Sequence, residues 1–279
     1  MDPDAVRRSL EWRAQLFRRR VRALLGAPTE RRDLELQSAA GYPIAARITR
    51  PVGAGRLPGL LVSPAIHQGR DALDTGDSIV TADELARLGY AVLTHDPAGR
   101  GGSWGEEDFG GPEHQDDLRV AGEALQREGN VTGFGVLSLS YGVVAAVAAL
   151  ARWPEALPAR WLVDWEGPSD REIITTGGTR LVPAAGHALD DEDYWQPREP
   201  IRHLAAVRCG YLRLQAWPDH AQGREIRHAE RMVRAANMLP WWQLNDHPRN
   251  TLPPRPNWLP GGPWAANQTV LRRLADLRG

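Results

Sequence analysis

The segment 136–142 places a serine where an apolar strand would turn into an apolar helix. Ser140 has small residues two positions before it and two positions after it, Ser138 and Gly142. A nucleophile elbow needs small residues there, because its strand and helix approach closely around a serine held on a strained turn. Glycine is usual at both positions, so Ser138 is a departure. The pattern predicts that Ser140 is a catalytic nucleophile.

A second glycine-rich segment, 96–105, follows a predicted strand and precedes a predicted helix. Its sequence, D-P-A-G-R-G-G-S-W-G, resembles the D-x-R-G-x-G-x-S loop of the α/β-hydrolases, with Ala98 in place of the common arginine. The resemblance covers about residues 32–247 and is strongest to dienelactone-hydrolase-like, S15-type and acyl-peptidase-like serine hydrolases. It implies an α/β-hydrolase fold and a Ser-His-Asp triad. The glycine spacing is not G-x-G-x-x-G, so no dinucleotide cofactor is expected.

A serine hydroxyl is inert at neutral pH, so Ser140 needs a base, and the base needs an orienting carboxylate. The resemblance implies the chain order Ser, acid, His. Asp219, after a predicted strand, is the first choice for the acid, and His247, after the last predicted strand, is the first choice for the base. The alternatives left open are Asp164, with Glu166 beside it, for the acid, and His220 or His228 for the base.

Acyl transfer also needs donors for the developing oxyanion. The backbone NH of Tyr141, next to the nucleophile, is one candidate. The loop after residues 60–62 supplies the second: Pro64 has no NH, which leaves Ala65 or Ile66. Further side chains follow strands whose carboxyl ends face the ligand edge of an open α/β sheet. The predicted pocket residues among them are His67, Trp165, Trp195 and Trp217.

The elements that would position these residues can be read from hydrophobic patterning. Two extended runs, 34–38 and 44–49, predict a hairpin. Strands are then predicted at 60–63, 91–95, 131–139, 161–164, 211–216 and 241–244, with helices at 78–88, 113–128, 143–152 and 224–237. This alternation predicts an α/β protein with a mostly parallel, doubly wound sheet of about eight strands.

Three segments lie outside that alternation. Residues 1–28 have the spacing of an amphipathic helix that docks on the body, residues 167–200 predict a small lid, and residues 248–263 hold six prolines and predict an extended surface segment. The main domain is expected to span 29–279. No apolar run approaches the roughly 20 residues that cross a bilayer, and no signal-peptide core follows the N-terminal arginines.

Composition narrows the chemistry further. All 34 basic residues are arginine, so Schiff-base and pyridoxal-phosphate enzymes and the lysine phosphate-binding loop are excluded. A net charge of -1 implies no strong field for nucleic acid. One cysteine, Cys209, excludes internal disulfides and thiolate-rich zinc sites, and suits a reducing, cytoplasmic compartment. Arginine is expected to supply surface charge and to take no part in the reaction.

The sequence therefore predicts a cytoplasmic serine hydrolase that cleaves a carboxylic ester or lactone, or less favourably an amide or peptide, through an acyl-enzyme. It predicts a small-molecule acyl substrate, no cofactor, no metal, no nucleic-acid partner and no membrane partner. One alternative is an enzyme of the same fold with a non-hydrolytic role, such as a lyase, cyclase or acyltransferase. Another is a binding protein in which the elbow survives only as architecture.

Overall fold

The computed structural model describes residue 14 and residues 26–76, 78–176, 187–237, 257–258 and 263–278. Its strands are β1 (Thr29–Gln37), β2 (Pro43–Pro51), β3 (Leu57–Ser63), β4 (Ala91–His95), β5 (Val131–Leu139), β6 (Trp161–Trp165), β7 (Gly210–Gln215) and β8 (Asn257–Trp258). They form one eight-stranded sheet in the order β1-β2-β4-β3-β5-β6-β7-β8. The first two strands form the predicted antiparallel hairpin, and β3 to β8 pair in parallel.

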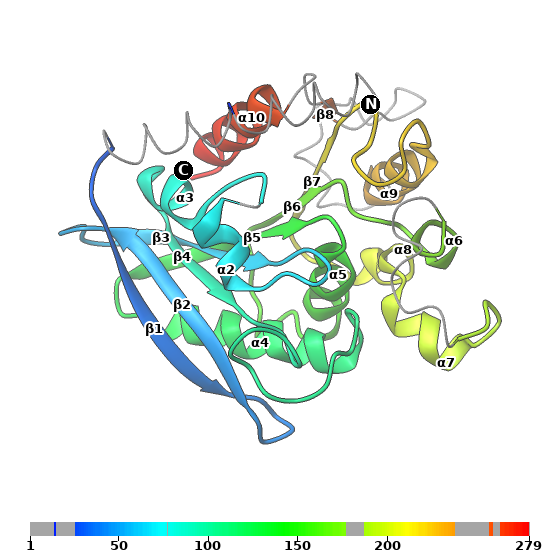
Figure 1. Ribbon diagram of the computed structural model, residues 1–279, viewed down its shortest axis with the longest axis horizontal. Coiled ribbons are helices and arrows are strands. Elements are labelled where there is room, and N and C mark those ends of the chain that lie inside the picture. The colour runs from blue at the N-terminus through cyan, green and yellow to red at the C-terminus, as the bar shows by residue number, and fades with distance from the viewer. Residues whose placement is uncertain are drawn as a thin grey trace.

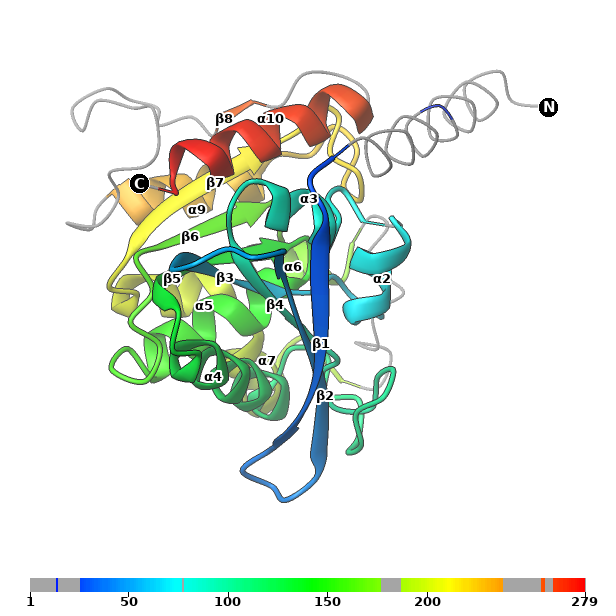
Figure 2. The same cartoon turned by 90° about the vertical axis from the view of Figure 1, so that its left-hand side faces the viewer.

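Helices cover both faces of this sheet (Figures 1 and 2). The longer ones are α4 (Pro112–Arg127), α5 (Gly142–Arg152), α9 (Arg227–Asn237) and α10 (Pro263–Asp276); the short ones are α2 (Arg70–Thr75), α3 (Ala82–Arg87), α6 (Arg171–Ile174), α7 (Glu192–Trp195), α8 (Pro200–His203) and the 3-10 turns η3 (Gln196–Arg198) and η4 (Leu204–Ala206). The α/β-hydrolase prediction is confirmed. No helix in the described ranges is long and apolar enough to cross a bilayer.

The core divides into two layers because successive strand residues point to opposite faces. Leu61 and Val136 belong to a cluster with α4, α5 and α9, whereas Leu60 and Leu137 belong to a cluster with α3 and α10. Buried strands with apolar residues on both faces are typical of parallel sheets. The sheet is held between these two clusters, and this packing fixes the strand ends that carry the candidate site.

Two helices begin later than the sequence pattern predicted, and local chemistry explains the first of them. The predicted helix 78–88 starts at Ala82, because Thr81 is its N-cap and forms a capping box with Glu84. The predicted helix 224–237 starts at Arg227.

Some predicted segments lie outside the described residues. They include most of 1–28, the strand 241–244, His247 and most of 248–263. The last described strand is β8, within the proline-rich segment. The predicted lid, 167–200, contains α6, α7, η3 and the start of α8, and its lid role stays a prediction.

Candidate active site

Ser140 lies at the turn between β5 and α5. Its φ of 50° is in the left-handed region that non-glycine residues rarely adopt, as an elbow requires. Its backbone NH donates to the carbonyl of Trp165 (2.8 Å), which continues the pairing of β5 with β6 beyond the strand. Gly142 has no room for a side chain, because a Cβ there would meet the backbone of Ser63 and Pro64. The elbow is therefore packed tightly against the end of β3.

His220 contacts the Ser140 hydroxyl. Its Nε2 lies 2.9 Å from Ser140 Oγ, and its Nδ1 lies 2.6 Å from Glu166 Oε2. An ionised carboxylate can only accept, so Nδ1 carries the proton and, in the neutral ring, Nε2 is the acceptor for the serine OH. Ser140, His220 and Glu166 thus form a continuous hydrogen-bonded relay.

Glu166 is held by the ends of two neighbouring strands. It follows β6, its φ is 52°, and its backbone NH donates to the carbonyl of Leu214 in β7 (3.0 Å). Its carboxylate also accepts from the backbone NH of Ala216 (2.8 Å) and of His220 (3.1 Å). The side chain is buried, and three donors from the loop after β7 leave its carboxylate little freedom to rotate.

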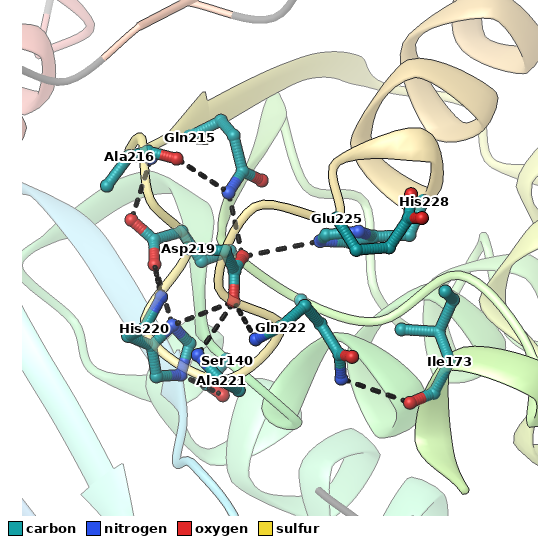
Figure 3. A network of polar contacts seen from close by, with 12 residues as sticks. Ser140, Ile173, Gln215, Ala216, Asp219, His220, Ala221, Gln222, Glu225 and His228 are labelled. Carbon is teal, nitrogen blue, oxygen red and sulfur yellow. Dashed lines mark hydrogen bonds and ion pairs between the residues drawn. The ribbon is translucent and has the colours of Figure 1, made fainter. Parts of the chain in front are cut away.

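Asp219, the first choice for the acid, has a different environment. Its Oδ1 accepts from the backbone NH groups of Ala221 and Gln222 (both 2.7 Å), and its Oδ2 accepts from the Gln215 side chain (2.7 Å). Oδ1 stays 3.8 Å from His220 Nδ1. Asp219 caps its own turn, as Figure 3 shows, while Glu166 makes the hydrogen bond expected of the acid.

Both carboxylates shape the electrostatics of His220. Burial lowers the pKa of His220, but the hydrogen bond to Glu166 and the charges of Glu166 and Asp219 outweigh it and raise that pKa above 6.5. Burial alone would raise the pKa of Asp219, yet the contact with His228, the charge of His220 and the loop donors hold it well below its usual range. Asp219 is therefore a second fixed negative charge beside the base.

The alternative residues occupy supporting positions. Asp164, fully buried, accepts from Tyr211 (2.6 Å) and from Arg213 (2.7 Å), and it pairs with none of the histidines that the structure describes. His228 on α9 is buried, with Nε2 3.3 Å from Asp219 Oδ2. His247 lies outside the described residues. Among the histidines that the structure describes, His220 is the one in contact with Ser140.

A buried polar chain connects these residues. Asp164 and Arg213 are register partners on β6 and β7, and both have fully buried side chains. Arg213 also donates to Gln215 Oε1 (2.7 Å), whose amide in turn holds Asp219. Arginine was expected to supply surface charge, but Arg213 is a buried cation within the sheet behind the site.

The predicted pocket residues divide into three environments. Trp165 stacks on His220 with ring centroids 4.9 Å apart and 17° between planes, and Trp217 is half exposed on the loop that carries His220. His67, with φ 55°, meets the Phe109 ring edge-on at 6.0 Å. Trp195 is different: it is fully buried in the core, and its indole NH donates to the carbonyl of Ala188 (2.9 Å). Trp195 is thus a packing residue, because α7 places it in the core cluster that includes residues of α4, α5 and α9.

Backbone strain is concentrated in this region. The non-glycine residues with positive φ in the described ranges are His67, Phe109, Ser140 and Glu166. Ser140 and Glu166 belong to the relay, and the rings of His67 and Phe109 contact each other. The Tyr141 hydroxyl also donates to the Phe109 carbonyl (3.0 Å). Conformations of this kind persist where the surrounding structure over-determines them, which is common at active sites.

The backbone NH of Tyr141 makes none of the hydrogen bonds found among the described residues, and the same holds for Ala65 and Ile66. All three belong to the segments that meet at the elbow, after β5 and after β3. They are available as donors to a bound group.

One triplet, Glu166, Asp219 and His220, has its ligand atoms within 4.8 Å of one another. Two carboxylates and an imidazole could in principle hold a divalent cation. The hydrogen bond from Nδ1 to Glu166 satisfies the same atoms without an ion. The Asp219 oxygens are held separately by Gln215, Ala221 and Gln222, so the carboxylate oxygens and ring nitrogens of this cluster all have hydrogen-bond partners among the described residues.

Sequence reasoning named Glu166 only as a neighbour of Asp164, and His220 only as an alternative. The order Ser, acid, His still holds, but the acid follows β6 and the histidine follows β7. A signal was present in His220 itself, which lies five residues after the end of β7 and directly beside Asp219.

Comparison with known proteins agrees with this architecture. Residues 40–244 match the model of the X-Pro dipeptidyl-peptidase (S15) family. A search of curated proteins finds no match.

Solved structures share the fold at low identity. An esterase of Pyrobaculum calidifontis is 16% identical, with a TM-score of 0.65 over 100% of this chain and 93% of that one. An esterase of Pyrococcus furiosus is 15% identical, with a TM-score of 0.60 over 90% and 92%. An acylaminoacyl peptidase of Pyrococcus horikoshii is 12% identical, with a TM-score of 0.64 over 89% of this chain and 41% of that one. With the family match spanning most of its length, the chain belongs to the X-Pro dipeptidyl-peptidase (S15) family and is a serine hydrolase of the α/β-hydrolase fold.

Proposed function

We propose that the protein hydrolyses a carboxylic ester or lactone through an acyl-enzyme on Ser140, with His220 as general base and Glu166 as the orienting carboxylate. The observation that carries this proposal is the relay itself, in which Ser140 Oγ lies 2.9 Å from Nε2 and Glu166 lies 2.6 Å from Nδ1 of the same ring. Both distances are within the reach that proton transfer requires.

In the first half-reaction, Ser140 Oγ attacks the acyl carbon and its proton passes to His220 Nε2. The negative charge that develops on the carbonyl oxygen is stabilised by backbone NH groups, that of Tyr141 and one from the loop after β3. Glu166 stabilises the imidazolium. The tetrahedral intermediate then collapses, its bond to the leaving oxygen breaks, and His220 returns the proton to that oxygen.

In the second half-reaction, His220 removes a proton from water and the resulting hydroxide attacks the acyl carbon. The bond to Ser140 Oγ breaks, and the proton on His220 returns to the serine. The products are a carboxylic acid and an alcohol, or a hydroxy acid from a lactone, and the mechanism uses no cofactor.

Support for an apolar acyl group comes from the surroundings of the relay. Trp165 stacks on His220, and Tyr141, the residue after the nucleophile, donates from its hydroxyl to the backbone carbonyl of Phe109. Aromatic side chains of this kind line apolar ligand sites. The second candidate substrate class is a peptide with proline at its second position, which the description of the matched family favours.

The non-hydrolytic alternative was based on an incomplete triad. Within the described ranges the nucleophile, the base and the carboxylate are all in hydrogen-bonded contact. A complete relay has no evident use in a protein that only binds. This supports acyl-enzyme chemistry over the lyase role and the binding role. An acyltransferase or cyclase would use the same relay with another nucleophile in place of water, so the product of turnover in water distinguishes them from a hydrolase.

The test begins with a fluorophosphonate probe on wild-type protein and on Ser140→Ala. We expect a covalent adduct at Ser140 in the wild type and none in the variant. Turnover of p-nitrophenyl acetate is then compared with turnover of glycyl-prolyl-p-nitroanilide, and we expect the ester to be the better substrate. No adduct on folded wild-type protein would overturn the serine mechanism, whereas faster cleavage of the anilide would overturn the ester assignment only.

A further inference from the structure

Arg100 lies in the loop after β4. It is buried, and its side chain contacts the loop after β3. Its side chain is 7% exposed. Its Nη1 donates to the carbonyls of Ala65 and Gln68 (both 3.1 Å), and its Nε and Nη2 donate to the two oxygens of Glu107 (both 2.7 Å). A two-point pairing of this kind fixes the plane of the guanidinium and also compensates its charge.

The contact to Ala65 has a geometric consequence one residue further on. The carbonyl of Ala65 and the NH of Ile66 belong to the same planar peptide unit, in which the two bonds point in opposite directions. The Ala65 oxygen is held from two sides, by Arg100 and by the backbone NH of Gln68 (3.1 Å). Fixing that oxygen fixes the direction of the Ile66 NH.

The loop that carries this peptide is packed against the nucleophile elbow. Ser63 Oγ donates to the carbonyl of Gly142 (2.8 Å), and a Cβ on Gly142 would collide with the backbone of Ser63 and Pro64. Ile66 itself packs against the core cluster that includes residues of α4, α5 and α9. The NH of Ile66 and the NH of Tyr141 are therefore carried by two segments whose relative position is fixed.

We propose that Arg100 is a positioning residue of the oxyanion hole, which orients the Ala65–Ile66 peptide so that the Ile66 NH acts as the second oxyanion donor beside the Tyr141 NH. This inference rests on the proposed acyl-transfer function. The cation on the far side of the peptide also polarises it, which strengthens the NH as a donor. Arg100 acts through the peptide and does not touch the substrate.

The matched experiment compares Arg100→Met and Arg100→Lys with Arg198→Met. Arg198 is as buried as Arg100, and it too pairs with a carboxylate, Asp108, and with backbone carbonyls, those of Tyr194 and Asp108. It makes no contact with residues 65–68 among the described residues. With p-nitrophenyl acetate, Arg100→Met is expected to lose about 10- to 100-fold in kcat with KM unchanged, since a whole oxyanion donor supplies about 10²- to 10³-fold. Arg100→Lys keeps a cation near Ala65 and is expected to recover part of the loss, and Arg198→Met is expected to keep the wild-type kcat.

A transition-state analogue separates positioning from general destabilisation. Affinity for an alkyl trifluoromethyl ketone is expected to fall in Arg100→Met by the same factor as kcat/KM, because the hemiketal oxyanion needs the same donors. Rates are normalised to the fraction of protein that a fluorophosphonate labels at Ser140, so unfolded protein does not count. If Arg100→Met fails to fold, the double variant Arg100→Met with Glu107→Met removes both partners and takes its place.

The outcomes distinguish the inference from the function on which it rests. The serine mechanism stands if the wild type is labelled at Ser140 and turns over the ester. The Arg100 assignment is wrong if, in addition, Arg100→Met and Arg198→Met have the same kcat and the same affinity for the ketone. If wild-type Ser140 is not labelled at all, the proposed function has failed first.

Discussion

Glu166 Oε2 accepts hydrogen bonds from both the backbone NH and the Nδ1 of His220, at 3.1 Å and 2.6 Å. One carboxylate oxygen thus fixes the position of the histidine backbone and the orientation of its ring. Because Glu166 follows β6 and His220 follows β7, the pairing of these two strands places the acid against the base.

The first prediction concerns the nucleophile. Ser140→Ala is expected to lower kcat for p-nitrophenyl acetate by roughly 10⁶-fold, because triad residues act as a unit. Steady-state kinetics after size-exclusion purification measure it. Ser138→Ala is the matched control, and it is expected to keep most activity, since the hydroxyl of that buried serine donates to the carbonyl of Val163 (3.3 Å) and not to His220. Near-normal turnover by Ser140→Ala would contradict the assignment.

The second prediction separates the histidines. His220→Ala is expected to lose about as much kcat as Ser140→Ala. His228→Ala removes a buried ring that faces Asp219 and not Ser140, so its loss is expected to be about tenfold or less. His247→Ala completes the series. A loss in His247→Ala as large as that in Ser140→Ala, with His220→Ala active, would transfer the role of base to His247.

The third prediction concerns pH. The base must be neutral to accept the serine proton, and the pKa of His220 is raised, so kcat/KM is expected to rise with pH through a midpoint above 6.5. Glu166→Gln removes the hydrogen-bonded charge and Asp219→Asn removes the second charge, so both are expected to move that midpoint to lower pH.

The two carboxylate variants differ in rate. Glu166→Gln is expected to lower kcat by about 10³- to 10⁴-fold, in line with loss of the orienting acid in other triads, and Asp219→Asn by much less. Glu199→Gln, a buried carboxylate paired with Arg171, is the control and is expected to leave the pH profile unchanged. The reverse order of losses would make Asp219 the acid.

The sequence predicted the features that depend on neighbours along the chain. The elbow at Ser140 needs only a strand, small flanking residues and a helix, all of which can be read from residues 131–152. The sheet follows similarly from hydrophobic runs of five to nine residues. The glycine-rich loop 96–105 was recognisable for the same reason.

The acid and the base could not be chosen this way, because the choice depends on contacts between distant strand ends. Asp219 lies in a turn that suits an acid, but its oxygens are used by Ala221, Gln222 and Gln215. Glu166 has no turn signature, and only the pairing of β6 with β7 brings it to His220. Periodicity cannot rank two carboxylates that both follow strands.

The fourth prediction tests the buried cation behind the site. Arg213→Met leaves Asp164 buried without its ionic partner, so the free energy of unfolding is expected to fall by about 3–5 kcal/mol. Urea denaturation followed by circular dichroism measures the change. Because Asp164→Asn with Arg213→Met removes both charges, the pair is expected to recover part of the loss. Equal stability of Arg213→Met and wild type would show that the cation contributes nothing.

The stacking of Trp165 on His220 gives the site an optical signal of its own. A protonated imidazole in face contact quenches indole fluorescence, whereas the neutral ring does so weakly, so Trp165 emission should decrease as the pH falls through the pKa of His220. The chain contains eleven tryptophans, and subtracting the emission of Trp165→Phe isolates this one. The protonation state of the base could then be followed in real time by light, without a substrate.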